Sequence, residues 1–186
     1  MSVAAPAQAF KAPARTVATT VALAGVGLHT GAPAKVTLHP EEAGAGLAFL
    51  AGGERVPVHP DQARTPGGCT VLGAARTVEH LLAAVLVAGV TDLTIELDGP
   101  EVPGLDGSAL PWLELIGEPV TTGWTEGLQV GGPTRLEAHG GVAVAEPAGG
   151  LEVAVTVAFP GLHQGCRAGP HDLASVLDAR TFLLHA

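Results

Sequence analysis

The segment TVEHLLAAVLVAGVTDLTIELD, residues 77–98, contains the two patterns that decide the fold class. Its first half is almost continuously apolar, which is typical of a helix buried between other elements, and we expect Thr77 to cap that helix and Gly89 to end it. Its second half, residues 91–98, alternates apolar and polar side chains, which indicates a strand with one buried face. Together these patterns predict a layer of helix packed on a sheet.

Short strands are expected on both sides of this segment. Upstream, β-branched and apolar residues bounded by Gly and Pro predict strands at 16–23, 34–40, 46–50 and 54–59. Downstream, Ser108 precedes a second predicted helix, residues 109–117, with Trp112, Leu113 and Ile116 facing inward. Further strands are predicted near 128–131, 134–138, 142–146 and 151–158, followed by a Gly-rich turn and a helix that begins at residue 171.

This order of elements predicts an α+β fold made of two similar parts. Residues 1–15 are rich in Ala and Pro, and we expect them to form a loose tail. Residues 16–120 are interpreted as a first α+β domain, and residues 128–186 as a second. The intervening stretch, 118–127, has the composition of a linker.

Composition excludes several classes of protein. With 186 residues, 47% hydrophobic and 15% charged, the chain is long and apolar enough to fold around a core. A net charge of −9 without a basic stripe argues against nucleic acid as a partner. No apolar run reaches the length of a transmembrane segment. Cys69 and Cys166 fit no metal or redox spacing, so a reducing cytoplasm is the expected location.

Glu79 and His80 stand in the first turn of the predicted helix and are its only ionisable residues. Free backbone N–H groups and the helix dipole favour an ionised Glu and a neutral His there. A neutral imidazole can bind a metal, and a carboxylate beside a metal-bound water can take its proton. The alternative is an ordinary dipole partner beside a partly buried His, because the HExxH spacing is absent.

Other candidate residues also have two interpretations each. His29 is a turn residue or a ligand, and Thr181 is a hydroxyl donor or simply a helix residue. Cys69 is a small buried residue or a nucleophile with His80 as its base, which would make the protein an unrelated cysteine hydrolase. The three carboxylates of residues 98–108 lack calcium-loop spacing and indicate a rigid turn.

Five motifs in fixed order narrow these alternatives: GVGLHTG, CTVLG, TVEHLLAAV, DGPEVPGLDGS and DARTF. From about residue 14 to 183 the chain thereby resembles the UDP-3-O-acyl-N-acetylglucosamine deacetylases, the zinc enzymes that commit bacteria to lipid A synthesis. The resemblance implies two similar two-layer sheet-plus-helix domains packed face to face. It implies a deacetylase, a hydrolase that releases acetate from a UDP-linked, acylated amino sugar.

The resemblance also implies roles for individual residues. Glu79 matches the general base, His80 the first zinc ligand, and Thr181 a hydroxyl that stabilises the oxyanion. The residues that match the substrate or acyl-chain pocket, or an adjoining active-site segment, are Leu28, His29, Cys69 and Phe182.

The chain departs from the family pattern in two places. It ends at Ala186, before the positions that would match a second His and an Asp of the zinc site and the His that protonates the leaving amine. We therefore expect a truncated second domain, weak zinc binding, little activity of this chain alone, and self-association through exposed valines. Just before Cys69, residues 66–68 are smaller than is usual in the family. The alternative function is a non-catalytic remnant or binding module that keeps the pocket.

Overall fold

The computed structural model describes residues 8–138, 140–169 and 171–180. They form two compact units. The sheet–helix unit consists of residues 13–125 and 177–180, and the hairpin unit consists of residues 126–176 with the start of the first strand.

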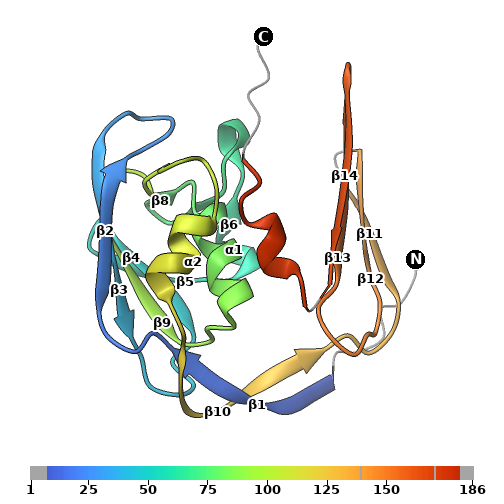
Figure 1. Ribbon diagram of the computed structural model, residues 1–186, viewed down its shortest axis with the longest axis horizontal. Coiled ribbons are helices and arrows are strands. Elements are labelled where there is room, and N and C mark those ends of the chain that lie inside the picture. The colour runs from blue at the N-terminus through green and yellow to red at the C-terminus, as the bar shows by residue number, and fades with distance from the viewer. Residues whose placement is uncertain (1–7, 139, 170, 181–186) are drawn as a thin grey trace. The chain divides into compact units, whose positions relative to one another are not determined.

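The sheet–helix unit is built on a five-stranded sheet whose strand order is β2-β3-β9-β4-β5 (Figure 1). The strands are β2 (Val21–Val26), β3 (Pro33–Pro40), β9 (Leu93–Asp98), β4 (Leu47–Ala51) and β5 (Glu54–Pro57). Only β4 and β9 of these neighbours run parallel. The mixture of sheet and helices confirms the predicted α+β class.

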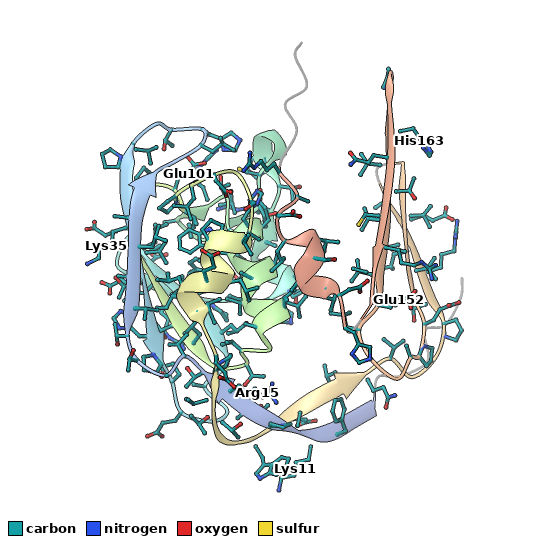
Figure 2. All side chains as sticks on the ribbon, in the orientation of Figure 1. Lys11, Arg15, Lys35, Glu101, Glu152 and His163 are labelled. Carbon is teal, nitrogen blue, oxygen red and sulfur yellow. The ribbon has the colours of Figure 1, made fainter. Side chains whose placement is uncertain are left out.

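One face of this sheet is apolar and the other is polar, as the alternating strand predicts. In β9 the side chains of Leu93, Ile95 and Leu97 are buried. On the opposite face the His39 Nε2 and Glu96 Oε2 atoms of neighbouring strands lie 2.7 Å apart. Figure 2 shows Lys35 pointing away from the helices on this outer face. A single covered face explains why the strand alternates.

Helices α1 (Glu79–Ala88) and α2 (Leu110–Ile116) contact each other and pack against the apolar face (Figure 1). Gly89 ends α1 as predicted: it has φ of 72°, and its N–H and that of Val90 donate to carbonyls of the last turn. As predicted for a helix packed among other elements, α1 buries Leu81, Ala84 and Val85, but its Leu86 side chain is 60% exposed. In α2, Trp112 and Ile116 are buried as predicted.

Three short strands lead into α1 and form a second small sheet. They are β6 (Ala63–Arg64), β7 (Val71–Leu72) and β8 (Ala75–Arg76), with the 3-10 turns η1 (Pro60–Gln62) and η2 (Pro66–Gly68). This sheet places the CTVLG motif directly against the start of α1. No helix within the described residues is both long and apolar enough to cross a membrane.

Strand pairing at the N-terminus corrects two expectations. The stretch expected to be a loose tail contains all but the last residue of β1 (Gln8–Thr16), and residues 120–127 of the expected linker belong to β10 (Val120–Gln129). The two strands pair with each other, and Ala14 is fully buried. An Ala/Pro-rich segment has little intrinsic strand propensity, so it is the partner strand, about 110 residues away, that makes it extended.

Within its described residues, the hairpin unit contains two antiparallel hairpins and one 3-10 turn. The hairpins join β11 (Thr134–Ala138) to β12 (Gly141–Ala145) and β13 (Val153–Phe159) to β14 (Leu162–Ala168), and the turn is η3 (Leu173–Val176). Strand β14 replaces the predicted Gly-rich turn, since its backbone pairs with β13 along its whole length. The expected helix from residue 171 is only η3 within the described residues. Val153 and Val155 are exposed, as expected.

Candidate active site

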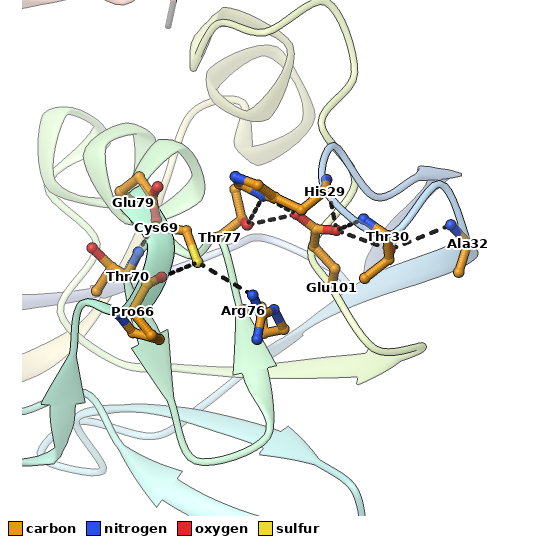
Figure 3. Close-up of polar contacts among 10 residues, drawn as sticks. All are labelled: His29, Thr30, Ala32, Pro66, Cys69, Thr70, Arg76, Thr77, Glu79 and Glu101. Atoms are coloured by element: carbon orange, nitrogen blue, oxygen red, sulfur yellow. Dashed lines mark hydrogen bonds and ion pairs between the residues drawn. The ribbon is translucent and has the colours of Figure 1, made fainter. Parts of the chain in front are cut away.

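The centre of the candidate site is the carboxylate of Glu101, which follows β9 and is fully buried (Figure 3). It accepts hydrogen bonds from the backbone N–H groups of His29 and Thr30, at 3.1 and 2.8 Å. The Thr30 and Thr77 hydroxyls donate to it at 2.9 and 2.6 Å, and His29 Nδ1 lies 2.8 Å from Oε1. One side chain therefore joins the GVGLHTG, TVEHLLAAV and DGPEVPGLDGS motifs.

These donors keep Glu101 ionised although it is buried. Burial raises the pKa of this carboxyl, but the hydrogen bonds from Thr77, His29 and Thr30 outweigh that effect and lower the pKa from 4.5 to about 2. A buried carboxylate with this many donors is a stable anchor for the loops that supply them.

Thr77 has a different role from the predicted helix cap. Its φ is 55°, in the left-handed region that a β-branched residue rarely occupies, and its hydroxyl donates to Glu101 instead of accepting from the helix. The residue at the N-cap position of α1 is Val78, which makes no side-chain cap. The prediction is wrong because an ionised acceptor 24 residues ahead competes for the hydroxyl. Such backbone strain costs about 1–3 kcal/mol and is typical of functional sites.

Glu79 occupies the first turn of α1, as predicted, and its carboxylate is held in place. Its Oε2 atom accepts a hydrogen bond of 3.0 Å from the Thr70 backbone N–H (Figure 3). Because Thr70 follows Cys69, this bond joins the CTVLG motif to the start of the helix. His80 lies beside Glu79 in the same turn and is half-buried.

The described residues do not by themselves make a zinc site. A catalytic zinc usually has three protein ligands and a water molecule. Among the residues that the structure describes, no three His, Cys, Asp or Glu side chains are grouped so that they could hold a metal. His80 therefore contributes a single imidazole, and a zinc ion bound there needs further donors.

Cys69 is buried, with 3% exposure, and its thiol has two polar neighbours. The Sγ atom donates to the Pro66 carbonyl at 3.4 Å and lies 3.8 Å from Arg76 Nη2. This geometry favours the interpretation as a small buried residue over a nucleophile. The backbone conformation explains the glycines before Cys69: Gly67 and Gly68 have φ of 62° and 80°, which glycine adopts without strain.

The GVGLHTG motif covers the end of β2 and most of the loop to β3, and it is packed against the Glu101 segment. A Cβ atom at Gly27 would run into the Glu101 carboxylate and the Thr30 hydroxyl, so only glycine fits. Leu28 and the His29 side chain are 45% and 38% exposed, which leaves both accessible to a ligand.

The last motif is described only up to Arg180. The Nη2 atom of Arg180 lies 3.3 Å from Asp106 Oδ2. Ser108 donates to Asp106 Oδ1 through both its N–H and its hydroxyl. These bonds from Ser108, followed by Arg180, lower the pKa of Asp106. Ser108 also accepts from the Leu110 N–H at 3.3 Å, but the N-cap residue of α2 is Ala109, which makes no side-chain cap, so the prediction that Ser108 caps this helix is wrong by one position. Thr181 and Phe182 lie outside the described residues.

Glu101 is the functional candidate that sequence reasoning missed. The available signal was that, of the three carboxylates in residues 98–108, Glu101 is the one flanked closely by Pro, Val and Gly on both sides. That signal indicates a buried acid, but it does not identify the donors, which come from segments 24 and about 72 residues away.

The fold and the site define a class of protein: a two-layer α+β domain whose ordered motifs converge next to a Glu–His pair at a helix start. The chain belongs to the family of UDP-3-O-acyl N-acetylglycosamine deacetylase (LpxC), whose model matches residues 14–186.

Three curated relatives, all named UDP-3-O-acyl-N-acetylglucosamine deacetylase, illustrate the similarity. The protein of Anaeromyxobacter sp. (strain Fw109-5) is 39% identical over 183 residues, 90% of this chain and 60% of that protein. The Thermosynechococcus vestitus protein is 46% identical over 110 residues, 55% of this chain and 39% of the relative. The Brucella melitensis biotype 1 protein is 39% identical over 110 residues, which are 55% of this chain and 38% of that relative. The chain thus spans 60% or less of the length of these relatives.

Proposed function

We propose that the chain acts as a zinc-dependent deacetylase, hydrolysing the N-acetyl amide of UDP-3-O-acyl-N-acetylglucosamine in lipid A biosynthesis. The observation that carries this proposal is the Glu79 carboxylate, held by the Thr70 N–H beside His80 in a chain of this family. The named substrate of the relatives supports the choice of amide.

In the proposed reaction Glu79 is the proton acceptor. A water molecule adds to the amide carbonyl carbon, and its proton goes to the Glu79 carboxylate. The C–N bond then breaks, the amine nitrogen takes up a proton from solvent or from a further acid, and the free amine and acetate leave. The bond from Thr70 N–H to Oε2 leaves Oε1 available for this transfer and holds the carboxylate still.

The other predicted residues complete the proposal. His80 is proposed as one zinc ligand, the Thr181 hydroxyl as a donor to the oxyanion, and Leu28, His29, Cys69 and Phe182 as residues of the substrate pocket and its adjoining segment. Zinc binding requires donors in addition to His80. A cytoplasmic location belongs to the same proposal, because the relatives' substrate is a UDP-linked sugar and Cys69 and Cys166 are free thiols.

Acetate release from the named substrate tests the proposal. The protein is assayed with added zinc and with a chelator. Glu79→Gln should lower kcat by about 10²–10⁴-fold, the usual contribution of a general base. Glu114→Gln, which removes the same charge from an exposed site on α2, should leave kcat unchanged.

Two results would contradict the proposed deacetylase mechanism. A Glu79→Gln protein with the wild-type rate would exclude Glu79 as the proton acceptor. A protein that binds the substrate but releases no acetate under any metal condition would favour the binding-module alternative.

A further inference from the structure

The pair formed by His29 and Glu101 restricts where the imidazole can carry its proton. An ionised carboxylate has no hydrogen to donate, so every partner of Glu101 must be a donor. His29 Nδ1 lies 2.8 Å from Oε1 and must therefore bear a hydrogen. The second neighbour of Nδ1 is the Thr77 hydroxyl oxygen at 3.3 Å. That hydroxyl donates its own hydrogen to Glu101, so it can only accept from the imidazole.

Both neighbours of Nδ1 are thus acceptors, which leaves one neutral tautomer. Its other nitrogen, Nε2, then carries a lone pair and can accept a hydrogen bond. In Figure 3 the imidazole extends from its loop over Thr77, with the second ring nitrogen directed away from Glu101. The His29 side chain is 38% exposed, so a ligand can reach this nitrogen.

We propose that Glu101 is a positioning residue that selects the Nδ1–H tautomer of the His29 imidazole and presents Nε2 as a hydrogen-bond acceptor to the substrate. The substrate class is a sugar with a hydroxyl or amide N–H group that donates to Nε2. This assignment of a substrate rests on the proposed function, whereas the tautomer does not.

The surroundings of Glu101 make it specific for this role. Two of its other partners are backbone N–H groups of the same loop, so the carboxylate holds the His29 backbone as well as the ring. The loop backbone at Gly27 lies so close to the Glu101 carboxylate that a side chain there would not fit. Ring and main chain are therefore fixed by one group, and a shift of Glu101 changes both.

The tautomer can be measured directly by long-range 1H–15N NMR on the 15N-labelled chain at neutral pH, with the His29 signals assigned by a His29→Gln variant. We expect the chemical shift of Nδ1 to be that of a protonated nitrogen and the shift of Nε2 that of an unprotonated one. The chain contains its own control: His39 Nε2 faces Glu96 at 2.7 Å, so His39 should show the opposite tautomer.

Paired variants separate positioning from general stability. Glu101→Gln should shift His29 away from the Nδ1–H tautomer, and Glu96→Gln should change only His39. In turnover or substrate titration, Glu101→Gln should raise KM or Kd about five- to tenfold, the usual effect of one lost hydrogen bond, with a smaller change in kcat. Glu101→Asp should partly restore the tautomer.

A wild-type spectrum with His29 in the Nε2–H tautomer, or with both ring nitrogens protonated at neutral pH, would overturn the proposal without any variant. An unchanged His29 tautomer in both a folded Glu101→Gln protein and a folded Glu101→Leu protein, which has no acceptor oxygen at this position, would overturn the role of Glu101. If the NMR result is as expected but the protein neither binds nor deacetylates the UDP-sugar, the proposed function fails while the tautomer assignment stands.

Discussion

Acidification should destabilise the sheet–helix unit through Glu101, and a Glu101→Gln variant isolates that effect. The folded state lowers the pKa of this carboxyl from 4.5 to about 2. A group with a depressed pKa stabilises the folded state above its unfolded pKa, and this stabilisation is lost as the pH falls. The sensitive window therefore lies between pH 4.5 and pH 2.

The magnitude follows from the size of the shift. At pH 7 the ionised, hydrogen-bonded carboxylate contributes about 3 kcal/mol to the free energy of unfolding relative to a neutral side chain. By linkage the same contribution falls to about 2 kcal/mol at pH 3.5 and to under ~1 kcal/mol at pH 2.5. The difference between wild type and Glu101→Gln should follow these values.

Urea unfolding from pH 7 to pH 2.5, followed by tryptophan fluorescence, measures this difference. Trp112 is fully buried in the core under α2 and reports on the unit that contains Glu101. Glu114→Gln is the charge-matched control, because Glu114 is exposed on α2. It should track the wild type at every pH. A Glu101→Gln deficit below ~1 kcal/mol at pH 7, or one that does not change with pH, would refute the reasoning.

Three further predictions concern packing and access. Gly27→Ala should lower the free energy of unfolding by about 1–3 kcal/mol and change the His29 NMR signals, because the added methyl group meets the Glu101 carboxylate. Urea unfolding and NMR measure the two effects, and a variant as stable as the wild type would contradict the prediction. Phe49→Ala should cost about 3–5 kcal/mol, since Phe49 is fully buried; unfolding in urea measures it, with exposed Leu128→Ala as control. Iodoacetamide should modify exposed Cys166 at least ~10-fold faster than buried Cys69. Mass spectrometry measures the two rates, and faster modification of Cys69 would contradict the prediction.

The local elements of the sheet–helix unit could be predicted from their own residues. Gly89 ends α1 because only a residue that tolerates positive φ closes the helix there. The alternation over 91–98 predicted the buried face of β9, since successive side chains of a strand point to opposite sides. The position of Glu79 in the first helical turn was predicted because the apolar helical run begins directly after it. All of these depend on neighbours within a few positions.

Tertiary structure alone decided the features that depend on distant partners. An Ala/Pro-rich stretch becomes β1 only because β10 supplies backbone hydrogen bonds, and β14 forms only against β13. The hydroxyl of Thr77 leaves the helix end because folding brings the ionised Glu101 within 2.6 Å of it. The sequence by itself determined which residues could be buried, capped or ionised. Which of them meet was settled by packing, since a hydrogen bond between residues 24 or 72 positions apart has no local signature.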